Sequence, residues 1–354
     1  MPGRVNEMSS TLKDHNPGGK RRATLVDVAR LAAVGLGTAS RVFNDNPNVN
    51  VETVRRVHEA ANLLGYQRNA VARNLRMRRS AAIGIIVPHI GGPFMDNCIR
   101  AAQAVIRAQK YVSVLAFSND DRETEIEEID YLLQRQIDGI LIVPAQGGST
   151  NQMDSRLLSG TPIVAFDQPL SWLKADEVLV SNRSGMEMAT HHLIEHGHKR
   201  ITCVKISRNV YTLHARLEGY RRAMRSAQLE PDIAELGPSG EGALEVVDCW
   251  LKSKKPPTAI VTMNEITSIE ILLALASRNV QIPQQLAIVA FDDVQLGPML
   301  RSPLTVVRQP ATDIGHLGAT LLMKRVVEKS TDAPRRTLLN TELVLRESCG
   351  CRKS

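Results

Sequence analysis

The chain has 354 residues, too many for one ordinary compact core, so we expect two or three folding units. The hydrophobic fraction of 43% is ordinary, and no apolar run is long enough for a membrane helix, which excludes a membrane protein. The first residues are polar and contain no signal-peptide core, so we predict a cytoplasmic protein. The net charge of +7 lies at the amino end, where residues 1–80 hold 14 Lys and Arg against 6 Asp and Glu, an excess that favours a polyanionic partner for that segment.

The pattern of residues 24–66 predicts three short helices. Thr24 is a good N-cap for the first helix, the second covers about residues 36–43, and Asn50 can cap the third. Three short helices with a tight turn between the first two are typical of a helix-turn-helix domain. In that motif the second helix enters the major groove of DNA and turns its first residues toward the base edges.

Four short runs in this part of the chain are shared with a known family. They are Thr-Leu-Val-Asp-Val-Ala at 24–29, Thr-Ala-Ser-Arg-Val at 38–42, Leu-Gly-Tyr at 64–66 and Ala-Arg-Asn-Leu at 72–75. The segment resembles the headpiece of the lactose/galactose-repressor (LacI/GalR) family, and the resemblance continues through nearly all of the chain after residue 23. It implies a sequence-specific transcriptional regulator, expected to be a repressor, with a flexible basic arm at 1–23, a helix-turn-helix domain at 24–66 and a hinge at 67–80.

The resemblance also implies roles for single residues. Leu36 and Gly37 would occupy the two positions that choose operator bases, and Arg41 would reach a guanine with its forked guanidinium. Leu75 would wedge into the minor groove and kink the duplex, unless it packs on the core. For Thr38 and Ser40 the alternative role is capping or packing. The other residues expected to contact DNA or to hold the headpiece and hinge in register are Thr24, Thr38, Ser40, Asn44, Asn48, Thr53, Tyr66, Asn69 and Arg73.

The headpiece departs from the family pattern in and around its turn. Ala33 stands where the family usually has Gly or Asn, and a left-handed backbone there would strain it by roughly 1 kcal/mol. Gly35 replaces a Ser or Thr cap, and Gly37 costs about 1 kcal/mol relative to Ala inside a helix. Because the side chains of Leu36 and Gly37 cannot hydrogen-bond a base, we expect an atypical operator half-site or readout through DNA shape.

From residue 81 onward short apolar runs alternate with helical patterns. The expected strands cover residues 83–87, 112–117, 139–143, 162–166, 177–180, 201–206, 258–262 and 286–291. The expected helices cover residues 95–109, 123–134, 185–196, 213–227 and 265–276. This alternation predicts an α/β fold of parallel sheets covered by helices, with a ligand site beyond the strand ends. The resemblance implies a two-lobed, periplasmic-binding-protein-like core at 81–348 that binds a small-molecule effector and forms a homodimer, followed by a tail at 349–354.

Residues that match the family's effector pocket stand mainly at the ends of the expected strands. They are Phe94, Asp167, Ser181, Thr212, Arg216, Asn264 and Asp292. The core departs from the family pattern at His89 for an acidic residue, Gly92 for Asn, Ser181 for Asp and Glu265 for Asp. Carboxylates with Asn suit sugar hydroxyls and a guanidinium suits a carboxylate, so we expect a sugar or a sugar acid. Surface ion pairs or strand-end caps are the alternative roles.

Cysteine and histidine residues raise the question of a metal. The five cysteines are scattered, and Cys349 and Cys351 have no second pair close in the sequence, so we interpret them as reduced thiols. His192 and His196 are spaced to share a helix face, but the segment after His196 matches a helix end of the family and no acidic ligand stands nearby. We therefore predict neither a metal site nor a cofactor.

Three other functions compete with the regulator. A secreted sugar-binding protein would share the core but would carry a signal peptide and no headpiece. An enzyme would need a reactive constellation, and we find no phosphate loop, nucleophile elbow or paired catalytic carboxylates. A DNA-binding protein that has lost effector sensing stays open, because several core residues depart from the pattern.

Overall fold

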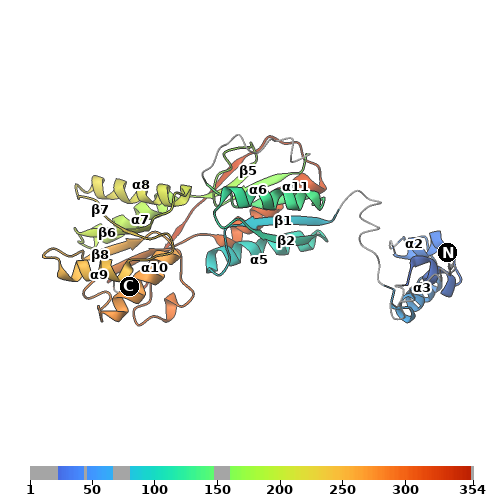
Figure 1. Cartoon of the computed structure of the whole chain (residues 1–354), viewed down its shortest axis with the longest axis horizontal. Coiled ribbons are helices and arrows are strands. Elements are labelled where there is room, and N and C mark those ends of the chain that lie inside the picture. The colour runs from blue at the N-terminus through green and yellow to red at the C-terminus, as the bar shows by residue number, and fades with distance from the viewer. Residues whose placement is uncertain (1–22, 44–45, 67–79, 147–159, 352–354) are drawn as a thin grey trace, which may run out of the picture. The chain divides into compact units, whose positions relative to one another are not determined.

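The computed structural model divides the chain into two compact units, residues 1–77 and 78–354, which we describe separately (Figure 1). The residues that the structure describes are 23–43, 46–66, 80–146 and 160–351. Asn44 and the hinge residues Asn69, Arg73 and Leu75 lie outside them, so their predicted contacts with DNA stay predictions.

The described part of the first unit contains helices α1 (Leu25–Leu31), α2 (Leu36–Phe43) and α3 (Val51–Leu63). Thr24 caps α1 as predicted, because its hydroxyl accepts from the Asp27 N–H and its own N–H donates to the Asp27 carboxylate. The Asn50 side chain accepts from the Glu52 N–H at 2.8 Å and so caps α3. The apolar faces of the helices form one small core of Val28, Ala29, Ala32, Ala39, Val42, Val57, Ala60 and Ala61.

The turn between α1 and α2 has the left-handed backbone expected from the sequence. Ala33 lies at φ 53°, although its side chain disfavours that region. The turn is closed by hydrogen bonds from the Ala33 N–H to the Arg30 carbonyl and from the Val34 N–H to the Ala29 carbonyl. The bend that orients α2 is therefore held by backbone bonds at the expense of local strain.

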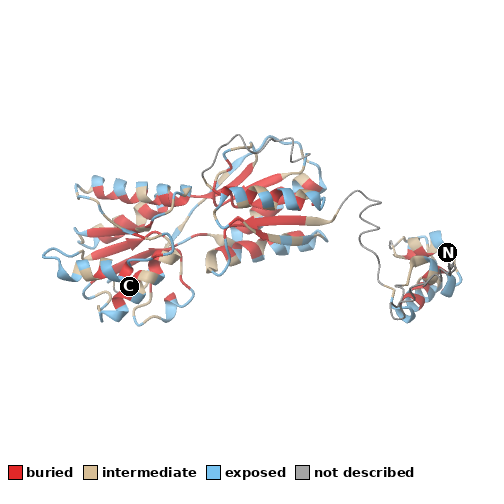
Figure 2. Ribbon diagram, in the orientation of Figure 1, coloured by how far each residue is buried: buried red, intermediate tan, exposed pale blue. Residues whose placement is uncertain are grey.

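The second unit has two lobes, each built on a six-stranded sheet, and Figure 2 shows the inner strands of the sheets as buried. The sheet of lobe 1 has the order β11-β5-β4-β3-β1-β2. Its strands are β1 (Ala82–Val87), β2 (Val112–Phe117), β3 (Gly139–Ile142), β4 (Ile163–Phe166), β5 (Asp176–Val180) and β11 (Arg336–Leu339). All its strand pairs are parallel.

Helices cover both faces of this sheet, which explains its continuous apolar strands. Helices α5 (Pro93–Ala108) and α11 (Ala311–Val327) pack on one face, against Ile83 and Ile85 among others. Helix α6 (Arg122–Gln134) covers the other face, where Ile86 points. Successive residues of β1 therefore bury their side chains in two different cores.

The sheet of lobe 2 has the order β12-β10-β9-β8-β6-β7. Its strands are β6 (Ile201–Ile206), β7 (Asp232–Leu236), β8 (Ala259–Thr262), β9 (Ala287–Phe291), β10 (Thr305–Arg308) and β12 (Glu342–Val344). Its helices are α7 (Asn182–Glu195), α8 (Tyr211–Ser226), α9 (Ala243–Lys252) and α10 (Glu265–Ser277), with a short 3₁₀ turn η2 (Gly297–Met299). The sheet is parallel as predicted except at one edge, where β12 pairs antiparallel with β10.

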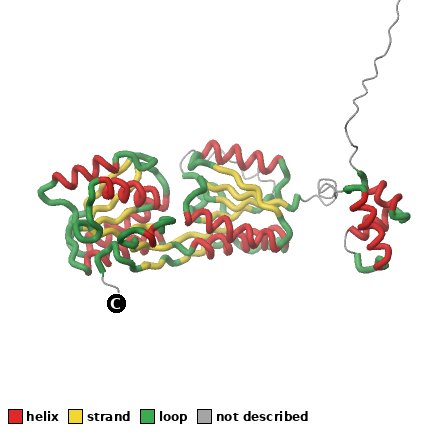
Figure 3. The backbone as a smooth tube through the Cα atoms, turned by 90° about the horizontal axis from the view of Figure 1, so that it is seen from below, coloured by secondary structure: helices red, strands yellow, loops and turns green. Residues whose placement is uncertain are grey.

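The chain passes between the lobes after β5, after β10 and between β11 and β12. Figure 3 shows the two lobes side by side, with backbone segments that connect them. The last two crossings follow from strands that the sequence patterns did not predict. Helix α11 was not among the predicted helices, and it contains Gly315 and Gly318, which lower helix propensity. The first of these glycines serves packing, since a Cβ at Gly315 would lie 2.0 Å from the Cys98 carbonyl oxygen on α5.

The carboxyl end of the described chain belongs to lobe 2. Cys349, expected at the start of a tail, is buried, because the preceding Ser348 hydroxyl donates to the Ile288 carbonyl and accepts from the Thr305 N–H. Among the described helices, none combines the length and apolarity of a membrane span.

Candidate functional site

The carboxyl ends of parallel strands from both lobes meet at one pocket, the place where ligands bind in such sheets. Strands β1, β2 and β4 contribute from lobe 1, and β6, β8, β9 and β10 from lobe 2. The polar lining consists of His89, Asp120, Asp167, Gln168, Arg208, Thr212, Arg216, Asn264, Glu265, Asp292 and Gln309. Apolar contact surface comes from Pro88, Phe94, Met95, Ile206, Val210, Leu213 and Ile266.

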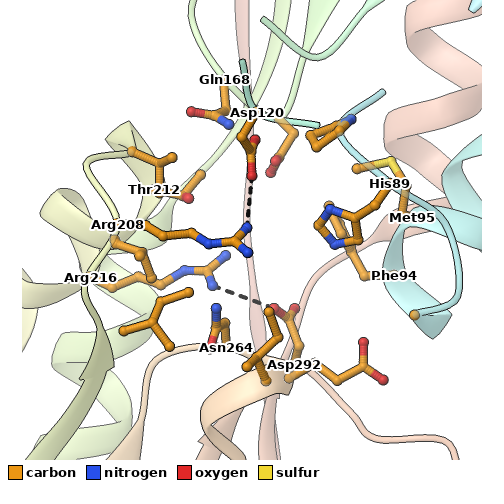
Figure 4. A pocket seen from close by; sticks show the side chains of 18 of the residues that line it. His89, Phe94, Met95, Asp120, Gln168, Arg208, Thr212, Arg216, Asn264 and Asp292 are labelled. Carbon is orange, nitrogen blue, oxygen red and sulfur yellow. Dashed lines mark hydrogen bonds and ion pairs between the residues drawn. The ribbon is translucent and has the colours of Figure 1, made fainter. Parts of the chain in front are cut away.

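Arg216 on α8 is the most firmly held cation of the pocket. Its Nε donates to Asn182 Oδ1 at 2.8 Å and its Nη1 to the Met263 carbonyl at 2.6 Å. Its guanidinium stacks on the Phe291 ring, 3.7 Å from the centroid, and pairs with Asp292 across 3.4 Å (Figure 4). These partners orient the guanidinium before any ligand arrives.

Asp292 follows β9 in a left-handed conformation, with φ 73°. One carboxylate oxygen faces Arg216 and the other accepts from Gln309 Nε2 at 2.6 Å. Burial raises the pKa of Asp292, against the lowering effect of Arg216 and Gln309. The carboxylate is therefore held in place by a cation and an amide from two other elements.

Asp167 follows β4, also with a left-handed backbone at φ 62°, and is 8% exposed. Burial raises its pKa to about 6; the charge of Arg216 lowers the pKa, and Asp292 and Asp120 raise it. Within the described residues no hydrogen-bond partner is found for Asp167 Oδ1, nor for the side-chain carbonyl oxygens of Gln168 and Gln309. Buried acceptors without partners are rare in folded proteins, and these three line one pocket.

Arg208 and Asp120 form an ion pair across the pocket. Arg208 Nη1, from the loop after β6, lies 3.0 Å from Asp120 Oδ2, in the loop after β2, and Figure 4 shows the two side chains pointing toward each other. Arg208 Nε donates to the Pro238 carbonyl at 2.8 Å, which fixes the guanidinium on lobe 2. The pair thus joins the two lobes.

Glu265 and Gly92 form a second contact between the lobes, and both residues depart from the family pattern. A Cβ on Gly92 would lie 2.1 Å from Glu265 Oε2, so the absence of a side chain at position 92 makes room for the longer acid at position 265. Burial raises the pKa of Glu265 to about 7, and the charges of Asp292 and Asp96 add to the rise. The bare backbone at Gly92 and the side chain of Glu265 therefore fit together sterically.

Six of the seven predicted effector residues line the pocket: Phe94, Asp167, Thr212, Arg216, Asn264 and Asp292. Ser181 does not, because it lies in the segment between lobes, where its hydroxyl accepts from the Thr341 N–H at 3.2 Å. Predictions from the sequence missed four polar lining residues, Asp120, Arg208, Gln168 and Gln309. The first two follow expected strands and could have been found by position, whereas Gln309 follows β10, which was not predicted.

The first unit presents the predicted DNA-reading residues on the surface of α2. Leu36, Gly37 and Arg41 are exposed, while Thr38 and Ser40 are half-buried beside the core residue Ala39. The remaining described residues predicted to contact DNA are Thr24, whose hydroxyl caps α1, exposed Asn48, half-buried Thr53 and Tyr66, whose ring packs on Phe43.

Comparison with known families gives two matches. Residues 24–69 match the family described as bacterial regulatory proteins, lacI family, and residues 190–349 match the periplasmic binding protein-like domain. The chain is 30% identical to the ribose operon repressor of Haemophilus influenzae over 330 residues, covering 92% of this chain and 98% of that protein. It is 31% identical to the catabolite control protein A of Priestia megaterium over 315 residues, 88% of this chain and 94% of that protein.

Solved structures of transcriptional regulators also match the chain. The transcriptional regulator CelR in complex with cellobiose matches with a TM-score of 0.67 and 27% identity, over 92% of this chain and all of that one. The lac repressor dimer bound to operator and the anti-inducer ONPF matches with a TM-score of 0.78 over 93% of this chain and 99% of that one; at 20% identity this shows the shared fold.

Proposed function

Since the chain belongs to the lacI family of bacterial regulatory proteins and is a DNA-binding transcriptional repressor rather than an enzyme, we propose that a neutral sugar, bound in the pocket between its lobes, controls how tightly a homodimer holds its operator. Arg41 would read a guanine, and the other exposed residues of α2 would set the operator sequence.

The charge of the pocket is the observation that carries the choice of a neutral sugar. Four carboxylates line it, on Asp120, Asp167, Glu265 and Asp292, and each of its two arginines is already paired with one of these acids. A sugar acid would bring further negative charge into a site with excess acid, whereas hydroxyls would donate to unpartnered acceptors such as Asp167 Oδ1. The sugars named for relatives, ribose and cellobiose, are neutral.

Control of DNA binding would follow from linkage between the binding of the sugar and the binding of the operator. The pairs Arg208–Asp120 and Glu265–Gly92 link opposite lobes at the pocket, so a ligand held there favours one arrangement of the lobes over another. If the two arrangements differ in DNA affinity, the sugar must change that affinity by an equal coupling free energy, typically about 1–3 kcal/mol.

Two measurements on the full-length protein test the proposal. The first is thermal denaturation with neutral sugars, beginning with ribose and cellobiose, and with the matching sugar acids. A neutral sugar should raise the melting temperature and also change the affinity for operator DNA. A pocket that responds to no sugar would mark a regulator without effector sensing, and a response to sugar acids alone would contradict a neutral ligand.

The second measurement is binding to a selected double-stranded operator against genomic competitor DNA. Arg41→Ala should reduce discrimination at one base pair by about 1–3 kcal/mol. Arg55→Ala is the control, because the Arg55 guanidinium is held on α3 by Glu52 at 2.6 Å and Glu59 at 2.8 Å. Equal losses on all sequences for Arg41→Ala would show that it touches only phosphate.

A further inference from the structure

Three soft-metal donors meet in lobe 2, away from the pocket. His192 lies in the last turn of α7, while Cys349 and Cys351 follow β12 at the end of the described chain. Cys351 Sγ is 3.1 Å from His192 Nε2 and 3.0 Å from Cys349 Sγ, and all three donor atoms lie within 4.8 Å of one another. The fold thus supplies the additional ligand that the sequence around Cys349 and Cys351 lacked.

Neighbouring residues hold the donors in this arrangement. The Thr305 hydroxyl donates to Cys349 Sγ at 3.2 Å, and Cys349 itself is 1% exposed. Gly350, between the two cysteines, lies at φ 83°, a left-handed conformation that glycine adopts without strain. The tight turn at Gly350 lets both thiols face His192, which is itself buried.

We propose that His192, Cys349 and Cys351 bind a zinc ion, with a water molecule as the fourth ligand. One imidazole nitrogen and two sulfurs are a donor set that zinc takes in tetrahedral sites, whereas Mg²⁺ and Ca²⁺ prefer oxygen. Zinc–sulfur bonds of about 2.3 Å and zinc–nitrogen bonds of about 2.0 Å place tetrahedral ligands roughly 3.5–3.8 Å apart. The Cys351–His192 and Cys351–Cys349 pairs, at 3.1 and 3.0 Å, therefore need to open by less than about 1 Å, while Cys349 and His192, which lie within 4.8 Å of each other, need to approach to about 3.5 Å.

The ion would fasten the end of the chain to α7. Both thiols must lose their protons on binding, so affinity should rise with pH. Zinc would join residues far apart in the sequence and stabilise lobe 2 by an amount that grows with the logarithm of the free zinc concentration once this exceeds the dissociation constant.

The test is titration of the full-length, reduced and chelator-treated protein with Zn²⁺, followed by calorimetry and thermal denaturation. We expect one zinc per chain, a raised melting temperature and, with Co²⁺ as a spectroscopic substitute, a thiolate-to-metal charge-transfer band. Cys351→Ser, at a half-buried position, and His192→Gln should each weaken zinc binding by at least about tenfold, since substitution of even the supporting residues of a metal site lowers metal affinity by that much.

Matched controls are Cys249→Ser, an exposed cysteine on α9, and His191→Gln, the histidine beside the site that is not part of the donor cluster. Both should leave zinc affinity unchanged. The proposal is overturned if the reduced protein binds no stoichiometric zinc, or if the controls lose as much affinity as the site variants. It is also overturned if Cys349 and Cys351 are joined in a disulfide when the protein is purified without oxygen.

Discussion

Arg208 Nη1 lies 3.0 Å from Asp120 Oδ2 and joins the loop after β6 in lobe 2 to the loop after β2 in lobe 1. The two side chains are 29% and 18% exposed, so solvent screens the pair and its stabilisation is about 1 kcal/mol or less. Because the pair spans the lobes, that free energy enters the equilibrium between lobe arrangements as well as the stability of the fold.

Breaking this pair should weaken binding of the sugar identified by thermal screening. Arg208→Gln and Asp120→Asn should each raise the dissociation constant by up to about fivefold, as expected for a pair that contributes about 1 kcal/mol or less, measured by calorimetry. The double variant should lose less than the sum of the single losses, since both remove the same contact. The control pair is Arg183→Gln and Glu218→Gln, an exposed ion pair at 2.9 Å within lobe 2 that should not affect binding. Strictly additive losses would show that Arg208 and Asp120 act separately.

Substitutions at Gly92 and Glu265, made singly and together, test whether the residues at these two positions compensate each other. Gly92→Asn should displace the Glu265 carboxylate, because a Cβ there would lie 2.1 Å from Oε2, and should weaken sugar binding about tenfold. Stability should change by less than about 1 kcal/mol, since the displaced group is the end of a flexible side chain and Gly92 has an ordinary φ of −104°. Adding Glu265→Asp should restore most of the affinity, and no recovery would show that the positions are independent.

The raised pKa of Asp167 predicts that the free energy of unfolding depends on pH. Burial raises its pKa to about 6 in the folded chain, against an ordinary value of 3.8, so across this window the folded state keeps a proton that the unfolded state has lost. The free energy of unfolding should therefore fall as the pH rises from about 4 to 6, in the ligand-free protein. Glu265, with a pKa raised to about 7, extends the fall in the same direction.

Replacing the carboxyl group should remove part of this dependence. Asp167→Asn should stabilise the ligand-free protein at pH 7 by on the order of 2 kcal/mol and change its stability little at pH 4, measured by urea unfolding. Glu127→Gln, an exposed acid on α6, is the control and should follow the native protein at both pH values. A variant less stable than the native protein at pH 7 would show that the charged carboxylate is stabilised by partners.

The sequence predicted the pocket only where the local signal was strong. Asp167 and Asp292 follow short strands made only of apolar residues, so their places at strand ends could be expected. Strand β10 is as short as β4 but begins with Thr305 and ends in Arg308, so its apolar run is only two residues long, and without it Gln309 could not be placed. The pairing of Arg208 with Asp120 depends on how the lobes approach each other, which no local pattern contains.

The donor cluster around His192 was even harder to predict from the sequence. Cys349 and Cys351 are neighbours in the sequence, but their approach to His192 depends on antiparallel β12 and on the hydrogen bonds of Ser348 that bury the end of the chain. Neither the short strand nor those bonds leave a periodic pattern. The family resemblance predicted the two lobes, and the particular contacts between distant segments required the fold.

Ala33 offers a test of strain in the headpiece. At φ 53° its side chain crowds the backbone, so Ala33→Gly should stabilise the first unit by about 1 kcal/mol, less the entropy that glycine adds to the unfolded chain. Ala32, the neighbouring C-cap of α1, lies at an ordinary φ of −76° and is 5% exposed. Ala32→Gly should therefore destabilise the same unit by a similar amount and serves as the matched control.

Hydrogen exchange of the amides of α1–α3 in the full-length protein measures this difference, because it reports opening of the headpiece without interference from the stability of the lobes. Protection should rise up to about fivefold in Ala33→Gly and fall in Ala32→Gly, as expected for a change near 1 kcal/mol. Operator affinity separates two roles of the strain. If the left-handed alanine only connects the helices, Ala33→Gly should bind operator as tightly as the native protein. Stronger protection accompanied by weaker operator binding would instead show that the strained turn sets the angle at which α2 meets DNA.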